Sequence, residues 1–567
     1  FDTGIFNFKN FKIMSLYIIK IIKNDYSHIE LLYKSDQANK IILDSNFDSS
    51  IFYGYFNNDE IIYENNKIIK LISRQLTNNI VGIIELYSKY IFPNNNRGIP
   101  GYIFKPLDNT LPKFIVHTKI KKTKSKNQLV SIRYKTWINN KIPYGELVSI
   151  YGDYNNINSI ENTLLHWYEL YPKKNLNITK EIQLNTNNRV LITDKIYTID
   201  PENCKDIDDG FSIINKDNKS IFKIHISDVY SVLYQNNILD HVNNYTSIYL
   251  SNKILHMIDN NLSINMCSLL EKTKRLMITL EIYLDNNDYH YKFYHSYGTI
   301  TKNCSYESYP LTIHKYFDKL AILYYKITNN EFIINDSHTF IEALMIIYNK
   351  LFVNNLLDKN KTPIYRSQSI FEQFIKTKDE LSIFLDIIHS NSAHYTLTNN
   401  FHQSLNITNY THSTSPIRRI IDLINQGIFS NSDYLFRKFD LDTINKYNDI
   451  LKKYYRKINV IKLAYILYNG NSKIVECYIY DFIDYKLEIF IPTYNINIRY
   501  RIIDKKVRNL SSFEYEETDQ FKNLLVSIDR DLYSIPMNTK ISVEINGNPD
   551  IFSINNSITI NMDQFKT

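Results

Sequence analysis

The stretch "TIDPENCKDIDDGF", residues 198–211, concentrates acidic side chains beside apolar ones. Its four aspartates lie within ten positions, at Asp200, Asp206, Asp208 and Asp209. Such a group suits a divalent cation, because Mg²⁺ takes oxygen ligands from one or two carboxylates, from water and from phosphate. A bound cation would also offset the mutual repulsion that raises the pKa values of neighbouring acids. Taken alone, however, the stretch fits a solvated turn after a strand better than a metal site.

A second stretch, "YTHSTSPIRRIIDLINQ" at residues 410–426, changes that balance. Ser415 followed by Pro416 predicts a helix start, and Gly427 predicts its end. The isoleucines recur at helical spacing and leave Arg418 on another face. A guanidinium at a helix N-terminus is suited to bind a phosphate. The alternative is an ordinary surface ion pair between Arg418 and Asp422, four residues apart.

Together the two stretches resemble the two signatures of the ribonuclease II (RNB) exoribonucleases, in the same order and at a similar separation. Shorter segments between them also resemble this family, and the similarity covers most of the chain. "IFKPLDNTLPKFIV" and "IPYGELVSIYGD" look like the second cold-shock-type barrel of its eukaryotic members. The chain looks closest to members similar to the exosome's catalytic subunit, but without an N-terminal endonuclease domain. We also expect that an N-terminal portion is missing from this sequence.

The resemblance implies a processive hydrolytic enzyme that degrades single-stranded RNA from its 3′ end to nucleoside 5′-monophosphates. Carried onto matching positions, Asp200, Asp206, Asp208 and Asp209 would hold Mg²⁺, or Mn²⁺ in its place, and the attacking water. Asp208 is the position on which cleavage depends most, and Asp209 is expected to act with it. Arg418 would contact the phosphate and stabilise charge that develops in the transition state.

The resemblance also implies RNA contacts outside the acidic stretch. Tyr249, in "SIYL", matches an aromatic residue that stacks on a base, which suits a nuclease indifferent to sequence. Tyr306 matches a tyrosine near the 3′-terminal nucleotides, and Glu342, a further candidate RNA contact, matches one member of a family Glu pair. Each of them is also compatible with an ordinary structural role. The densest basic run, residues 119–135, is as compatible with a solvated loop as with phosphate contacts; its candidate RNA-binding residues are Lys119, Lys121 and Lys122.

The chain departs from the family pattern at several positions. Gly210 stands where Ala is usual, Ala343 replaces one member of a Glu pair, and Ser413 replaces an aromatic residue. Asn425 and Gln426 stand where the family often has His and Arg. These departures keep open an alternative function, a weakly active or inactive family member that binds RNA as a regulator. A metal nuclease acting on DNA is a third alternative, because the carboxylates alone do not distinguish the two polymers.

The length of 567 residues predicts three or four domains of a multidomain α+β protein. Short strands before and after a mixed central region predict small β-barrels at both ends. The expected order is two N-terminal OB or cold-shock-like barrels, a mixed α/β RNB catalytic domain and a C-terminal OB-type RNA-binding barrel. The expected boundaries are 1–80, 81–178, 179–468 and 469–567.

Bulk composition is less informative. Lys and Arg number 66 against 59 Asp and Glu, a net charge of +7 that is compatible with a polyanion but does not demonstrate one. The four cysteines are scattered, which argues against a disulfide framework or a zinc site. The sequence predicts no membrane association, because no apolar run reaches about 18 residues. We expect an intracellular monomer, cytoplasmic or nuclear, that binds single-stranded RNA; an exosome-like complex is compatible with the sequence but not implied by it.

Overall fold

The computed structural model falls into two compact units, and each is described by itself. The central unit comprises residues 172–453, and the terminal unit comprises residues 1–171 and 454–567. The structure describes residues 15–22, 26–35, 39–43, 48–76, 79–87, 92–120, 127–137, 142–173, 178, 181–216, 219–285, 288–368, 381, 384–385, 392–470, 472–483, 485–502, 510–517, 522–528, 531–548 and 558–566.

The N-terminal part of the terminal unit contains two β-structures that share one apolar core. The first is a five-stranded sheet of order β3-β2-β1-β4-β5. The second is a closed barrel of order β10-β8-β7-β6-β9, against which helix α1 packs. Trp137, just after β9, stacks on Tyr53 with 5.0 Å between ring centroids, a contact that joins the two β-structures. The elements are β1 (Leu16–Ile21), β2 (Ile29–Tyr33), β3 (Lys40–Ile42), β4 (Glu60–Glu64), β5 (Lys67–Ser73), β6 (Ile80–Glu85), β7 (Gly101–Pro106), β8 (Phe114–His117), β9 (Gln128–Thr136), β10 (Tyr144–Asp153) and α1 (Ile157–Trp167).

The C-terminal part of the terminal unit is again β-structure, around one apolar core. It consists of a five-stranded sheet, β22-β21-β20-β26-β27, and a three-stranded sheet, β23-β24-β25. Every second residue along part of β20 and along β21 belongs to this core, as the period of two predicts, namely Val475, Cys477, Ile479, Leu487, Ile489 and Ile491. Its strands are β20 (Lys473–Ile483), β21 (Lys486–Ile491), β22 (Ile496–Arg501), β23 (Leu510–Glu517), β24 (Lys522–Ile528), β25 (Asp531–Met537), β26 (Lys540–Gly547) and β27 (Ile558–Ile560).

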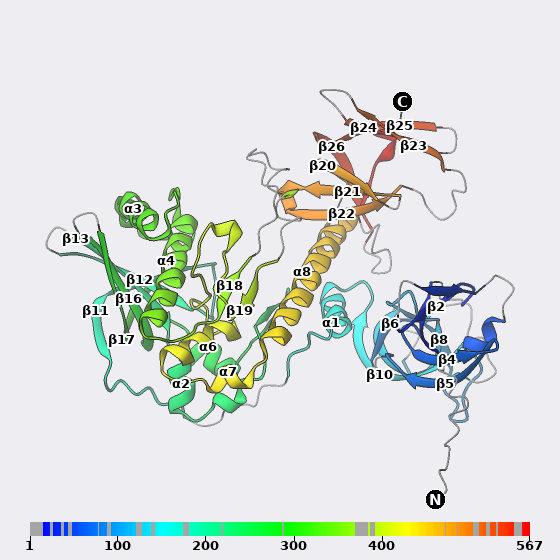
Figure 1. The fold of residues 1–567 in the computed structure, drawn as a ribbon, viewed down its shortest axis with the longest axis horizontal. Helices are drawn as coiled ribbons and strands as arrows, with labels where there is room; N and C mark the ends of the chain where they lie inside the picture. Colours follow the sequence, from blue (N-terminus) through cyan, green and yellow to red (C-terminus); the bar gives the residue numbers. More distant parts are fainter. Residues whose placement is uncertain are drawn as a thin grey trace, which may run out of the picture. The chain divides into compact units, whose positions relative to one another are not determined.

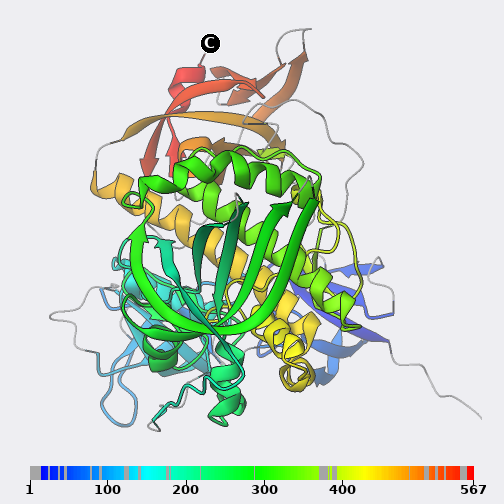
Figure 2. The ribbon, with the colours of Figure 1, turned by 90° about the vertical axis from the view of Figure 1, so that its left-hand side faces the viewer.

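The central unit is built on a closed barrel of order β11-β12-β13-β16-β17, with helices against it (Figures 1 and 2). Phe211 of β12 packs edge-on against Phe340 of helix α4, and Phe293 of β17 packs likewise against Tyr348. The barrel strands are β11 (Val190–Asp200), β12 (Asp209–Lys216), β13 (Lys219–Ser227), β16 (Lys274–Asp285) and β17 (Asp288–Ser305). The remaining elements of the unit include β14 (Ile248–Tyr249), β15 (Ile254–Leu255), α2 (Val229–Gln235), α3 (Phe317–Thr328), α4 (Ser337–Asp358), β18 (Tyr365–Ser367), β19 (His394–Thr396), α6 (Ile420–Phe429) and α7 (Tyr434–Lys438). The long helix α8 (Leu441–Asn469) begins in the central unit and continues into the terminal unit.

Helix α4 is formed by "HTFIEALMIIYNKLFVNNLLDKN", in which apolar residues recur at helical spacing. A capping box starts it, in which Asp336 accepts the N–H of Thr339 at 2.8 Å. Among the described residues, it is the one helix long and apolar enough to cross a membrane by length and composition. The sequence prediction that no apolar stretch is long enough to span a membrane is therefore corrected for α4. The most apolar part of α4 is 67% buried, which is usual for a core helix.

The helix that follows the second signature begins later than the sequence predicts. Ser415 and Pro416 do not cap it; the N–H groups of Arg418 and Arg419 bond the carbonyl of Ser415 in a turn, and α6 starts at Ile420. Gly427 does not end it either, since α6 continues to Phe429. A β-carbon on Gly427 would lie 2.9 Å from the ring of Tyr230, so the glycine serves close packing against α2.

Candidate functional site

One cavity of about 520 Å³ in the central unit gathers most of the residues that the sequence singled out. It lies between the start of β12, helix α4 and the turn before α6. Its lining includes all four aspartates, both predicted tyrosines, the glutamate and the arginine, namely Asp200, Asp206, Asp208, Asp209, Tyr249, Tyr306, Glu342 and Arg418. Residues 200–209 and 418, far apart along the chain, therefore form one site.

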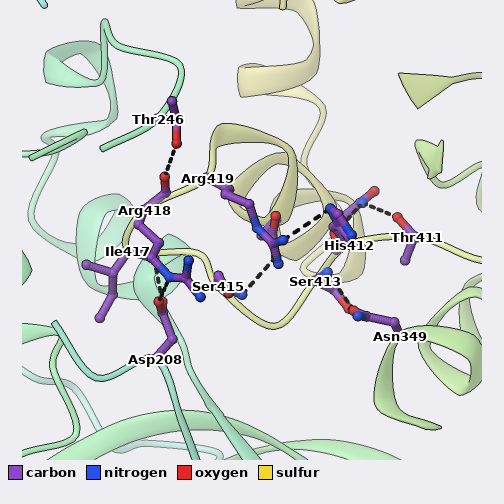
Figure 3. Close-up of polar contacts among 12 residues, drawn as sticks. Asp208, Thr246, Asn349, Thr411, His412, Ser413, Ser415, Ile417, Arg418 and Arg419 are labelled. Atoms are coloured by element: carbon purple, nitrogen blue, oxygen red, sulfur yellow. Dashed lines mark hydrogen bonds and ion pairs between the residues drawn. The ribbon is translucent and has the colours of Figure 1, made fainter. Parts of the chain in front are cut away.

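Asp208 is the aspartate held most tightly by the protein. It is 2% exposed, and its Oδ1 accepts the N–H of Ile417 at 2.8 Å while its Oδ2 accepts Nε of Arg418 at 3.1 Å (Figure 3). Its carbonyl accepts the N–H of Ser227, at the end of β13, at 2.9 Å. The loop between β11 and β12 is thus fixed both to the barrel and to the turn that carries Arg418.

Asp206 has a different partner. The hydroxyl of Tyr249 donates to its Oδ2 at 2.6 Å, and the thiol of Cys204 lies 3.7 Å from its Oδ1. Tyr249 keeps 39% of its surface exposed, so its ring remains accessible. The predicted stacking residue and a predicted metal ligand are therefore in direct contact.

Burial determines the acidity of the other carboxyl groups. It raises the pKa of Asp208 to about 7, against the opposing effects of Arg418 and the Ile417 N–H. Burial also raises the pKa of Asp200 and Asp209, and each is raised further by neighbouring carboxylates. Several carboxyl groups therefore share a poorly solvated pocket, in which Arg418 forms an ion pair with Asp208.

The donor set fits a hard divalent cation in part. All four candidate ligands are carboxylate oxygens, and Oδ2 of Asp200 is buried without a hydrogen-bond partner. Among the residues that the structure describes, however, no three His, Cys, Asp or Glu side chains converge as a metal-holding group. Asp206 and Asp208 are instead occupied by protein donors. The pattern fits a Mg²⁺ ion held by one or two carboxylates and completed by water and phosphate oxygens; the role of all four as ligands stays a prediction.

The turn that carries Arg418 is also joined to the segment that carries Tyr249. The carbonyl of Arg418 accepts the hydroxyl of Thr246 at 2.7 Å and the N–H of Ser247 at 3.0 Å (Figure 3). The N–H of Ile420 bonds the carbonyl of Tyr245 at 2.9 Å. Hydrogen bonds to the backbone therefore connect the turn of Arg418, the predicted phosphate contact, to the segment of Tyr249, the predicted base contact.

The predicted alternative of an Arg418–Asp422 pair is wrong. Arg418 pairs with Asp208, and Asp422 pairs instead with Arg419, whose Nη2 lies 2.8 Å from Oδ1 of Asp422. Arg419 also lines the cavity, although the sequence did not single it out. The doubled arginine in "PIRR" was the signal that could have found it.

The departures at Asn425, Gln426 and Ser413 have structural explanations. Asn425 is fully buried and bonds both the N–H of Ile364, at 3.0 Å, and the hydroxyl of Thr411, at 2.8 Å. Gln426 bonds the carbonyl of Ser227 at 2.7 Å and the N–H of Tyr230 at 3.2 Å. These two residues tie α6 to the strands and to α2.

Ser413 donates its N–H and its hydroxyl to Oδ1 of Asn349, on α4, at 2.8 and 2.9 Å (Figure 3). The segment before the Arg418 turn is therefore held to α4 by polar contacts where the family has an aromatic ring. Gly210 lies against β11, and a β-carbon there would be 3.0 Å from the carbonyl oxygen of Tyr197. The structure leaves little room for the alanine that is usual at this position.

The remaining predicted RNA contacts differ in their placement. Tyr306 lines the cavity and stacks on His338 with 3.8 Å between ring centroids. Glu342 is exposed and lines the cavity, whereas Ala343 is fully buried in the core. Lys119 is exposed on the terminal unit, and Lys121 and Lys122 lie outside the described residues.

Comparison with known proteins agrees with this fold. The family model of the RNB domain matches residues 189–320 and 324–431, and that of the Dis3-like cold-shock domain 2 matches residues 101–169. These matches place the chain among multidomain proteins that join cold-shock-type barrels to an RNB domain. The chain therefore carries an RNB domain and a Dis3-like cold-shock domain 2, and the resemblance and the fold class predicted from the sequence are confirmed. No curated protein matches the chain by sequence.

Solved structures show the same architecture. RNase R from Mycoplasma genitalium, in complex with ribose methylated single-stranded RNA, matches with a TM-score of 0.68 and 15% identity, over 96% of this chain and 100% of that one. Yeast Ssd1, described as a pseudonuclease, matches with a TM-score of 0.56 and 13% identity, over 90% of this chain and 81% of that one. The Dss1 exoribonuclease active-site mutant from Candida glabrata matches with a TM-score of 0.50 and 15% identity, over 66% of this chain and 55% of that one. At these identities the likeness concerns the fold.

Proposed function

We propose that this protein is a divalent-metal-dependent exoribonuclease that hydrolyses single-stranded RNA processively from its 3′ end and releases nucleoside 5′-monophosphates. The observation that carries the proposal is the meeting of Asp208 and Arg418 in a cavity that also contains three further aspartates and two tyrosines. The RNB domain and the fold shared with RNase R support it. RNase R of Mycoplasma genitalium has been solved with both single-stranded and double-stranded RNA, which makes RNA the substrate class to test first.

In this proposal, different residues bind the cation and the substrate phosphate. Asp200 and Asp209 would hold the cation, since Oδ2 of Asp200 is buried without a hydrogen-bond partner, whereas oxygens of Asp206 and Asp208 accept from protein donors. Mg²⁺, or Mn²⁺ in its place, supplies Lewis acidity and an activated water when bound. Arg418 keeps 43% of its side chain exposed while its Nε bonds Asp208, so the guanidinium can also reach a substrate phosphate.

Tyr249 and Tyr306 supply the aromatic surfaces of the cavity. Each ring can stack on a base without regard to its identity, because every base has a π-face. Stacking of this kind orders the end of a single strand and leaves the phosphate to Arg418. It fits a nuclease that moves along RNA of any sequence.

The test is a gel assay with 5′-labelled single-stranded RNA, with and without Mg²⁺. Wild type should shorten the RNA progressively to a very short labelled product, and EDTA should abolish the reaction. Asp208→Asn should lower the rate by about 10²-fold or more, since groups that hold and orient the reacting centre contribute on that scale. Asp318→Asn, an exposed aspartate on α3, is the matched control and should cleave like wild type. Intact RNA with Mg²⁺ or Mn²⁺ present would refute the proposal.

The second candidate function is RNA binding without cleavage. Two observations favour it: the likeness to the pseudonuclease Ssd1, and the occupation of Asp206 and Asp208 by protein donors. The same samples distinguish the two functions on a native gel. RNA that is shifted but never shortened would identify a binding protein, and matched DNA and duplex substrates would define the polymer.

A further inference from the structure

Behind the turn that carries Arg418 lies a connected group of polar side chains, which we call the support network. It consists of Tyr395, His412, Arg419 and Asp422. Asp422 is fully buried and Tyr395 is 5% exposed. His412 and Arg419 line the cavity, and Tyr395 and Asp422 contact them.

The contacts of the network form a chain. The hydroxyl of Tyr395 lies 2.8 Å from Nδ1 of His412. Nη1 of Arg419 lies 3.2 Å from the same nitrogen (Figure 3). Because arginine only donates, Nδ1 of His412 acts as an acceptor here. Nη2 of Arg419 then donates to Oδ1 of Asp422 at 2.8 Å.

The chain ends on the backbone of the turn. Oδ1 of Asp422 also accepts the N–H of Ser415 at 2.8 Å. Two residues later, the N–H of Ile417 bonds Oδ1 of Asp208, and Nε of Arg418 bonds its Oδ2. The turn is therefore held at its first residue by Asp422 and at its far side by Asp208.

Helix α6 has a separate anchor. Its isoleucines, Ile420, Ile421 and Ile424, are at most 1% exposed in the apolar core shared with α2. The helix can thus stay packed through its apolar face if the polar contact of Asp422 is lost. The contact of Asp422 fixes the position of Ser415, and through Ser415 it fixes the position of Arg418.

We propose that Asp422, oriented by Arg419, is a positioning residue that places Arg418 against the substrate phosphate. The inference rests on the proposed nuclease function and names a residue that supports the reaction without touching the substrate. A buried acceptor that bonds both a backbone N–H and a guanidinium leaves the turn little freedom. Displacements of about 1 Å in such a site can lower a rate by about 10²-fold.

The first test compares single-turnover cleavage by Asp422→Ala, Asp422→Asn and the control Asp433→Ala. Asp433 forms an exposed ion pair with Arg437 on the next helix. Asp422→Ala should slow cleavage by about 10²-fold with little change in RNA affinity. Asp422→Asn keeps an acceptor for Ser415 and should stay within about tenfold of wild type, and the control should match wild type. A loss in Asp422→Asn as large as that in Arg418→Ala would overturn the inference, even if Asp422→Ala failed to fold.

The second test separates positioning from general destabilisation by a double-mutant cycle. If Asp422 acts through Arg418, then adding Asp422→Ala to Arg418→Ala should change the rate by less than about threefold. Multiplying effects would instead show that Asp422 acts independently of Arg418, and would overturn the inference.

Hydrogen exchange gives a readout that does not need catalysis. The amide of Ser415 should exchange at least tenfold faster in Asp422→Ala than in wild type, whereas the amides of α6 should change little. If wild type fails to cleave RNA, the proposed function fails, but this measurement still decides whether Asp422 holds the turn. Unchanged protection of Ser415 would show that it does not.

Discussion

His225, in the middle of strand β13, is buried without a charged partner. It is 0% exposed, with Nε2 at 3.0 Å from the hydroxyl of Ser212 and Nδ1 at 2.8 Å from that of Thr279. Burial and, to a smaller extent, the charge of Lys223 together lower its pKa to about 3. The folded barrel therefore holds this imidazole neutral at mildly acidic pH.

Burial of a neutral His225 makes the free energy of unfolding depend on pH. In the unfolded chain the histidine has a pKa of about 6.5. Below that pH the unfolded state binds a proton that the folded state does not, so stability is complete above pH 6.5 and falls toward pH 3. Each pH unit in this window costs about 1.4 kcal/mol, and the loss between pH 7.5 and pH 5 is about 2 kcal/mol.

The assay compares wild type with His225→Gln, which cannot titrate. Urea unfolding of β13 is followed at pH 7.5, 6 and 5 by pulsed hydrogen exchange at one fixed labelling pH. The other histidines contribute equally to both proteins, so the difference between them isolates His225. Wild type should lose about 2 kcal/mol more than the variant between pH 7.5 and pH 5.

Equal losses in the two proteins would refute this reasoning. They would mean that the folded barrel accepts a proton on His225, or that the side chain is solvated before unfolding. The variant is expected to start from a lower stability at pH 7.5, by about 1 kcal/mol for an imperfect hydrogen bond. That offset does not affect the test, which depends on the change with pH.

Three further outcomes follow from contacts in the central unit. Asp228→Ala should lower the free energy of unfolding by about 3–5 kcal/mol in urea, because it leaves the buried Arg189 without its partner at 2.8 Å. Gly427→Ala should cost about 1–3 kcal/mol by the same measurement, since the new methyl would lie 2.9 Å from the ring of Tyr230. Tyr249→Ala should weaken RNA binding by about 1–3 kcal/mol in a filter-binding titration, whereas Tyr249→Phe, which keeps the ring, should bind like wild type.

The architecture followed from local patterns to a large extent. Alternating apolar residues are typical of strands, as in "KIVECYIYDFIDYKLEIFIP", which forms β20 and β21. Apolar residues at helical spacing are typical of a helix, as in "HTFIEALMIIYNKLFVNNLLDKN", which forms α4. Both patterns repeat within a few residues. They indicate which face of the strand or helix is buried, and they do so whichever element packs against that face.

The same local rules failed at the Arg418 turn. Ser415 and Pro416 have the composition of a helix start, but the N–H of Ser415 bonds Asp422 and that of Ile417 bonds Asp208. These contacts satisfy the backbone groups that a helix start would leave free, and the helix begins only at Ile420. Tertiary hydrogen bonds therefore overrode the capping preference.

The sequence alone was enough to indicate the RNB domain and the residue types available to its cavity. Only the tertiary structure decided that Asp208 pairs with Arg418, that Arg419 pairs with Asp422, and that Tyr249 contacts Asp206. The physical reason is the distance along the chain over which each interaction acts. A side chain's local conformation depends on a few neighbours, whereas its charge partner is set by packing that joins segments some two hundred residues apart.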